Sequence, residues 1–281
     1  MRRFEYFEPA SLDEAVQLVA SANAQLLAGG TDLLVEIKEQ LRRVDRVVNI
    51  KRIPGIDGLS YDAREGLRIG ALVTAREIEL SKPVLQHYAS LAQSARELGS
   101  IQVRNRATIV GNVCRASPSA DTLPPLIADG ARVEIFGGKG ARALALEEFF
   151  TGPGRTVLAP DELVTELVLP PPKPRTGKVY IKHGRRKAME LATVGVAVSL
   201  TLDGDVNIVL GAVAPTPIRA RQAEALLRGK ALNDNLIAQA AEAAQSEARP
   251  ISNVRASAGY RRDMVRVLAR RALEQALDSI Q

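Results

Sequence analysis

The sequence has very few of the side chains that bind metals or stack on nucleobases. Among its 281 residues are one cysteine (Cys114), two histidines (His87 and His183), five Phe, five Tyr and no Trp. A structural zinc ion needs about four Cys or His ligands, and an iron–sulfur cluster needs about four cysteines. The chain alone can therefore form neither metal centre. A single cysteine also excludes a disulfide within the chain, which fits the reducing cytosol.

Charge and hydropathy argue against two further classes of protein. The net charge is +6, from 38 basic and 32 acidic residues that are interleaved along the chain. With so few aromatic residues to stack on bases, this charge suits a docking face or an anionic cofactor better than nucleic acid. The longest apolar run, residues 191–202, is shorter than the ~20 residues of a membrane span. Glu5 and Glu8 precede any apolar run, so the sequence predicts a cytoplasmic protein without a secretory signal.

The length and the residue patterns predict two or three packed units. The proline-rich segment 170–174 is a stiff break that we interpret as a domain boundary. Asp203-Gly204 lies between two apolar runs, 193–202 and 206–213, and predicts a β-hairpin. Capping and periodicity predict helices at 12–22, 32–40, 74–98 (one or two helices), 220–228, 233–248 and 257–279, and strands at 24–28, 44–50, 67–72, 132–136 and 163–169.

Two segments rich in small residues could hold a dinucleotide. Gly29-Gly30-Thr31 falls at a predicted strand-to-helix junction, where glycine allows close backbone approach and free N–H groups favour an anion. Glycine pairs are common in tight turns, so this motif alone is weak. Residues 108–112 and 117–121 add hydroxyls, an amide and a carboxylate, which suit ribose or ribitol hydroxyls. The spacing is not that of G-x-G-x-x-G, which argues against a Rossmann site.

These segments carry a family resemblance. Residues 28–34 (AGGTDLL), 104–112 (RNRATIVGN) and 116–125 (ASPSADTLPP) resemble the FAD-binding medium subunit of the molybdenum hydroxylases. This is the family of xanthine dehydrogenase and aerobic carbon monoxide dehydrogenase. The similarity continues through residues 182–192 and 254–262, so it extends over essentially the whole chain.

The resemblance implies an α+β fold in two domains. Residues 1–172 would form a two-subdomain FAD-binding domain of the vanillyl-alcohol-oxidase (PCMH) type, with subdomains at about 1–55 and 56–172. Residues 176–281 would form a C-terminal α+β domain like that of the carbon monoxide dehydrogenase flavoprotein, with a small antiparallel sheet. FAD would lie between the two subdomains.

The resemblance also implies a set of FAD-binding residues. The first loop would wrap the pyrophosphate, and the second would approach the cofactor from the other subdomain. Asp121 would bind sugar or ribityl hydroxyls, and Lys182 would place a cation near the isoalloxazine. Relatives more often have a second glycine where this chain has Val110. The expected residues are Leu26, Leu27, Ala28, Gly29, Gly30, Thr31, Asp32, Leu33, Thr108, Ile109, Val110, Gly111, Asn112, Asp121, Leu163, Lys182 and Leu191.

In such a complex the chemistry is shared among chains. The resemblance implies a large molybdopterin-binding subunit and a small [2Fe-2S] subunit, in a hetero-oligomer such as a dimer of heterotrimers. FAD on the medium subunit would accept electrons from the clusters and pass them to NAD, a quinone or another acceptor. No catalytic residue and no metal ligand is expected on this chain. The alternative function is a non-catalytic nucleotide-binding or scaffold protein with a basic docking surface.

Several of these residues also have an ordinary structural interpretation. Asp121 could cap the helix that follows it. Without the resemblance, Lys182 and the run Arg185-Arg186-Lys187 would be a solvated basic face. Cys114 is expected to be a small packing residue, since a lone cysteine most often is. His183 has no visible partner for acid–base chemistry.

Overall fold

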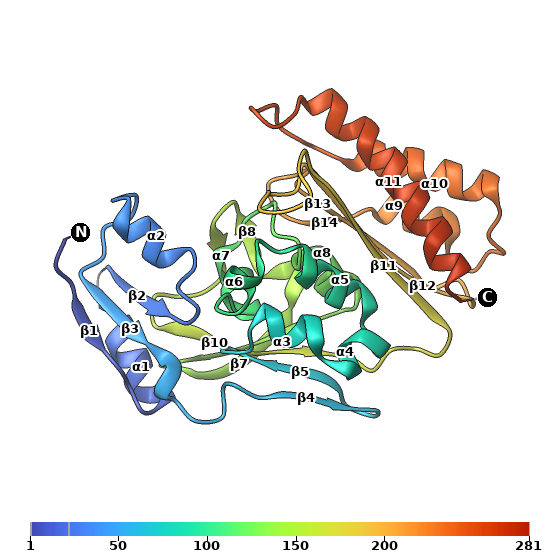
Figure 1. Ribbon diagram of the computed structural model, residues 1–281. Coiled ribbons are helices and arrows are strands. Elements are labelled where there is room, and N and C mark those ends of the chain that lie inside the picture. Colours follow the sequence, from blue (N-terminus) through green and yellow to red (C-terminus); the bar gives the residue numbers. More distant parts are fainter. Residues whose placement is uncertain (1, 22, 281) are drawn as a thin grey trace.

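The computed structural model describes residues 2–21 and 23–280. The chain begins with a small parallel sheet in which β3 lies between β1 and β2, with α1 and α2 as the connections (Figure 1). The Ser11 side chain accepts a hydrogen bond from the Glu14 N–H and so caps α1. The elements are β1 (Glu5–Phe7), α1 (Leu12–Val19), β2 (Ala24–Leu27), α2 (Leu33–Lys38), β3 (Arg46–Asn49) and the 3₁₀ turn η1 (Ile50–Arg52).

The middle of the chain forms an antiparallel sheet in the order β4-β5-β10-β6-β7, on which a group of short helices packs. Apolar residues of these strands and helices share one core. The elements are β4 (Leu59–Asp62), β5 (Gly66–Gly70), α3 (Ala75–Leu80), α4 (Lys82–His87), α5 (Ala89–Glu97), α6 (Ile101–Arg104), α7 (Ile109–Arg115), α8 (Leu123–Ala128), β6 (Arg132–Gly137), β7 (Gly140–Ala145), η2 (Leu146–Glu148), β8 (Phe150–Gly152), β9 (Arg155–Thr156) and β10 (Glu162–Leu169).

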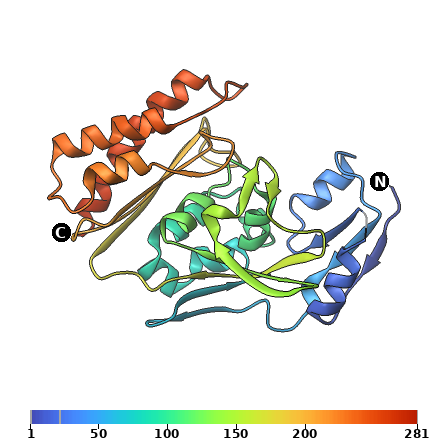
Figure 2. The same cartoon turned by 180° about the vertical axis from the view of Figure 1, so that it is seen from behind.

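The last third of the chain is an antiparallel sheet, β11-β12-β13-β14, with three helices on its outer face (Figure 2). Val179 and Ile181 of β11 face these helices, whereas Tyr180 belongs to the core of the preceding sheet and helices. The C-terminal sheet is therefore covered on both faces, with α5 and α8 on the inner one. The elements are β11 (Thr176–His183), β12 (Val194–Thr201), β13 (Val206–Gly211), β14 (Ile218–Arg219), α9 (Arg221–Leu227), α10 (Asp234–Glu247) and α11 (Ala258–Asp278).

The α+β class and the small C-terminal antiparallel sheet are confirmed, as is the hairpin of β12 and β13 around Asp203-Gly204. The predicted helix at 12–22 ends at Val19, and residue 22 lies outside the described residues. Residues 74–98 contain three short helices rather than the one or two predicted, because Pro83 lies in the first turn of α4 and Tyr88 separates α4 from α5. No helix in the described part of the chain combines the length and apolar character needed to cross a membrane.

Candidate functional site

A cavity of about 1070 Å³ lies between the N-terminal parallel sheet and the middle of the chain. This volume slightly exceeds the roughly 300–1,000 Å³ of most small-molecule sites, so the cavity can take a large ligand. Its walls come from the end of β2, the start of α2, α7, the start of β10 and the loop after β11. Both segments rich in small residues line it.

The turn after β2 brings the two segments together. Gly30 has φ +76°, a left-handed conformation that favours glycine. Gly29 packs directly on the segment before α7: a Cβ at Gly29 would lie 2.1 Å from the Arg106 carbonyl oxygen. A side chain at residue 29 would therefore separate the two walls of the cavity.

The second segment is mostly helix rather than loop. The Thr108 side chain accepts a hydrogen bond from the Gly111 N–H at 3.1 Å and so caps α7. Because this N–H is used by the cap, Gly111 offers no free donor. A Cβ there would lie 2.6 Å from Thr108 Oγ1, so glycine leaves room for the capping hydroxyl. Thr122 donates a hydrogen bond to Asn112 Oδ1 at 2.6 Å, which leaves the Asn112 amide NH₂ as the donor of that side chain.

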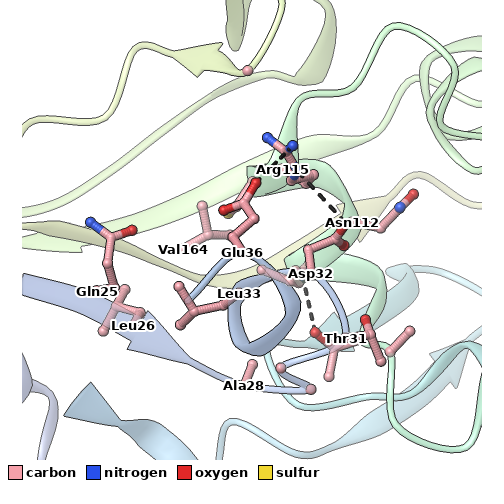
Figure 3. A pocket seen from close by; sticks show the side chains of 18 of the residues that line it. Gln25, Leu26, Ala28, Thr31, Asp32, Leu33, Glu36, Asn112, Arg115 and Val164 are labelled. Atoms are coloured by element: carbon pink, nitrogen blue, oxygen red, sulfur yellow. Dashed lines mark hydrogen bonds and ion pairs between the residues drawn. The ribbon is translucent and has the colours of Figure 1, made fainter. Parts of the chain in front are cut away.

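Arg115 links the two sides of the cavity. Figure 3 shows its side chain directed toward Glu36 and Asp32, which belong to the first part of the chain. Arg115 Nη2 lies 2.9 Å from Glu36 Oε1, and Arg115 Nε lies 3.7 Å from Asp32 Oδ1. Glu36 also pairs with Arg42 at 2.8 Å. Sequence reasoning missed Arg115, although it lies three residues after Asn112 and hence on the same face of α7.

Asp121 is a buried carboxylate in the cavity wall. Tyr180 Oη donates to Oδ1 at 2.7 Å, and Lys182 Nζ donates to Oδ2 at 2.8 Å. Burial raises the pKa of Asp121 to about 6, although Lys182 and Tyr180 act in the opposite direction. The interpretation of Asp121 as a helix cap is wrong, since Thr122 is the N-cap residue of α8 and Asp121 bonds to the C-terminal sheet instead.

Most of the predicted site residues line the cavity, including Leu191, which is half exposed. Four of them do not. Lys182 does not line the cavity, because its ammonium group is bound by Asp121 and by the Glu97 carbonyl oxygen at 3.0 Å. Three other predicted residues have their side chains in the core or against it, outside the lining: Leu27, Ile109 and Leu163.

The structure also shows the surroundings of the basic run, of Cys114 and of His183. Arg185 and Arg186 both pair with Glu190, whose side chain is buried. Burial raises the pKa of the Cys114 thiol to about 12, so this cysteine stays protonated in the cavity wall. His183 does have a partner, because its Nε2 lies 2.9 Å from Tyr260 Oη.

Comparison with known proteins agrees with this geometry. Residues 2–172 match the family model of the FAD binding domain in molybdopterin dehydrogenase, and residues 179–276 match that of the CO dehydrogenase flavoprotein C-terminal domain. The chain belongs to the FAD-binding subunits of the molybdopterin dehydrogenases. This subunit is 31% identical to the xanthine dehydrogenase FAD-binding subunit of Escherichia coli O157:H7, over 97% of this chain and 95% of the relative.

The subunit is also similar to proteins that act on other substrates. It is 33% identical to the carbon monoxide dehydrogenase medium chain of Hydrogenophaga pseudoflava, over 98% of this chain and 97% of the relative. A solved structure of carbon monoxide dehydrogenase from that organism superposes with a TM-score of 0.95, 33% identity and coverage of 99% of this chain and 98% of that one. The predicted family, fold class and FAD cofactor are confirmed, and the chain is a subunit of an oxidoreductase.

Proposed function

We propose that this chain is the electron-transfer subunit of a molybdenum-containing hydroxylase. It would receive electrons from [2Fe-2S] clusters on a small partner subunit and pass them through FAD to an acceptor such as NAD or a quinone. The substrate would be oxidised at a molybdopterin on a large partner subunit, in the cytoplasm. The observation that carries the proposal is the large cavity walled by both small-residue segments. FAD would supply one- and two-electron transfer there.

The glycine-lined wall of the cavity and its buried carboxylate both suit FAD. Gly29, Gly30 and Gly111 line the cavity, and a Cβ at each would lie within 3 Å of a neighbouring protein atom. Side chains at these positions would therefore disturb the wall that would hold a pyrophosphate. The Asp121 carboxylate has four lone-pair positions, and Tyr180 and Lys182 use two of them. The other two can accept hydrogen bonds from hydroxyl groups of the ribityl or ribose part. Leu191 and Val110 supply apolar surface to the same cavity.

Two arginines at the cavity offset the two carboxylates that would lie beside the pyrophosphate. A pyrophosphate near Gly29-Gly30-Thr31 would lie close to Asp32 and Glu36, which would repel it. Arg115 and Arg42 neutralise these carboxylates through the ion pairs described above. The chain needs no general base or nucleophile for this role, because its residues bind and orient the cofactor that carries the electrons.

The direct test is purification of the full chain with the chains that bind to it. We expect FAD absorbance at about 450 nm, a property of the cofactor. Molybdenum, iron and acid-labile sulfide should be found on the co-purifying subunits. Addition of the reduced iron–sulfur subunit under anaerobic conditions should bleach that absorbance. A chain that retains FAD but is not reduced by an iron–sulfur partner would contradict the electron-transfer role.

Replacing Arg115 by glutamine should weaken FAD binding because it leaves Asp32 and Glu36 with less neutralising charge near the pyrophosphate. Since the Arg115 side chain is partly exposed, we expect a moderate rise in the dissociation constant, about three- to tenfold, that shrinks as salt is added. Titration of the apoprotein with FAD at low and high salt measures it. Arg43→Gln is the control, because Arg43 pairs only at the surface and lies outside the cavity. An equal loss in both variants would refute the role of Arg115.

A further inference from the structure

We propose that Tyr180 is a positioning residue of the FAD site, and that its hydroxyl group holds the Asp121 carboxylate in the orientation that binds the cofactor. The proposal rests on the function proposed above, in which Asp121 accepts hydrogen bonds from FAD hydroxyl groups. It makes the C-terminal sheet part of the cofactor site, even though Tyr180 itself does not line the cavity.

The contact between Tyr180 and Asp121 joins two distant parts of the chain. Tyr180 lies in β11, is 1% exposed, and donates to Asp121 Oδ1 at 2.7 Å. An ionised carboxylate is only an acceptor, so the phenol is the donor. Lys182 holds the other oxygen at 2.8 Å from the same strand, two residues away. Two donors at fixed spacing on one strand define both the position and the rotation of the carboxylate.

The structure also fixes the position of Tyr180. Its backbone N–H donates to Gln93 Oε1 of α5 at 3.3 Å. On the neighbouring strand β12, Gly195 leaves the space that the phenol occupies, because a Cβ there would lie 2.8 Å from Tyr180 Oη. Gly195 is paired with Lys182 in the sheet, so this space opens next to the second donor. A substitution at Gly195 would displace the hydroxyl without changing its chemistry.

The charged and hydrogen-bonding groups that face Asp121 determine how its ionisation responds to the loss of this bond. Among the described residues they come from Tyr180 and Lys182 of β11, which favour the ionised form, and from Glu97 of α5, which opposes it. Burial has already raised the pKa of Asp121 to about 6. Removal of the Tyr180 hydroxyl takes away one stabilising donor, so the pKa of Asp121 should rise further. FAD binding that requires the ionised carboxylate should then weaken at a higher pH when the solution is acidified.

The experiment compares two buried phenols in the full chain. Tyr180→Phe should raise the FAD dissociation constant about tenfold at pH 7, as expected for a hydrogen bond to a charged group. In a plot of FAD affinity against pH, the loss of affinity on the acidic side (the acidic limb) should also begin at a higher pH than in the parent chain. Tyr88→Phe is the control, because Tyr88 is also fully buried and donates to a backbone oxygen, that of Pro170, at 2.8 Å. Tyr88→Phe should leave FAD affinity and its pH dependence unchanged. It should lower the stability of the chain by about as much as Tyr180→Phe does.

Two more variants separate the proposal from its premise. Gly195→Ala should reproduce the weaker binding of Tyr180→Phe, and Asp121→Asn should weaken binding while abolishing the acidic limb. If Asp121→Asn loses FAD but Tyr180→Phe binds with the affinity and pH profile of the parent chain, the positioning role is refuted. If Asp121→Asn binds FAD normally, the contact of Asp121 with the cofactor is refuted, and the role of Tyr180 with it. FAD binding elsewhere in the cavity would then stand.

Discussion

Replacing Gly29 by alanine should raise the dissociation constant of FAD at least about 100-fold, or about 2.7 kcal/mol. The added Cβ would lie 2.1 Å from the Arg106 carbonyl oxygen and 3.0 Å from the Ala107 Cα. These are backbone atoms, so no side-chain rotation relieves the overlap. The turn after β2 and the segment before α7 must therefore separate, and both line the cavity. Titration of the apoprotein with FAD, followed by flavin fluorescence, measures the effect.

The control for this prediction is Gly259→Ala. A Cβ at Gly259 would meet no atom within 4 Å, and the residue lies in the first turn of α11, away from the cavity. It should bind FAD as the parent chain does. A Gly29→Ala variant whose FAD affinity stays within about twofold of the parent, less than 0.5 kcal/mol, would show that the two segments need not approach so closely. The cofactor site would then have to be assigned elsewhere in the cavity.

Gly29 shows how far the sequence alone can predict the site. The glycine pair after a predicted strand suggests close approach of the backbone to an anion, and the structure shows that Gly29 also packs on another segment of backbone. The partner of Gly29, however, is Arg106, which is 77 positions away in the sequence. Local patterns describe the chemistry of a turn but not the distant backbone that packs on it. The neighbouring Gly30 differs, because its positive φ is a local requirement of the turn.

The second segment shows tertiary structure overriding local preference. Residues 108–115 are rich in β-branched residues and contain Gly111, all of which are poor helix formers. The resemblance implies a loop over residues 108–112, but residues 109–115 form α7. Ile109, Val110 and Val113 are buried in the core, and this burial stabilises a helix that the sequence alone would not form. Thr108 is the one local signal of where the helix begins, because its side chain caps α7.

Strand β11 was missed for a different reason. Residues 178–182 (KVYIK) alternate polar and apolar side chains, which is the pattern of a strand. Without the resemblance, Lys182 suggested a solvated basic face. Lys182 and Lys178 lie on the same face of the strand and are instead buried against the middle of the chain, where Lys178 meets Asp129 and Lys182 meets Asp121. Because buried lysines are rare unless paired, only the positions of their carboxylate partners identify this face.

The pair of Lys178 and Asp129 leads to the largest expected effect on stability. The two side chains are 7% and 1% exposed, with Lys178 Nζ 2.8 Å from Asp129 Oδ1 and 4.4 Å from the centre of the Tyr88 ring. Lys178→Met should lower the free energy of unfolding by about 3–5 kcal/mol near pH 8, because it leaves a buried carboxylate without its cation. Urea unfolding of the full chain measures the change. Arg270→Met removes an exposed ion pair with Glu274 and should have little effect.

The pH dependence of this variant distinguishes an unpaired carboxylate from lost packing. Burial raises the pKa of Asp129 in the folded chain above its ordinary value, and loss of Lys178 should raise it further. A folded state with the higher pKa binds the proton more tightly than the unfolded state, so stability falls as pH rises through that interval. Lys178→Met should therefore recover stability relative to the parent between pH 8 and pH 5, and adding Asp129→Asn should remove most of the loss. A deficit that neither acid nor Asp129→Asn relieves would mean that Lys178 acts through packing on Tyr88 rather than through its charge.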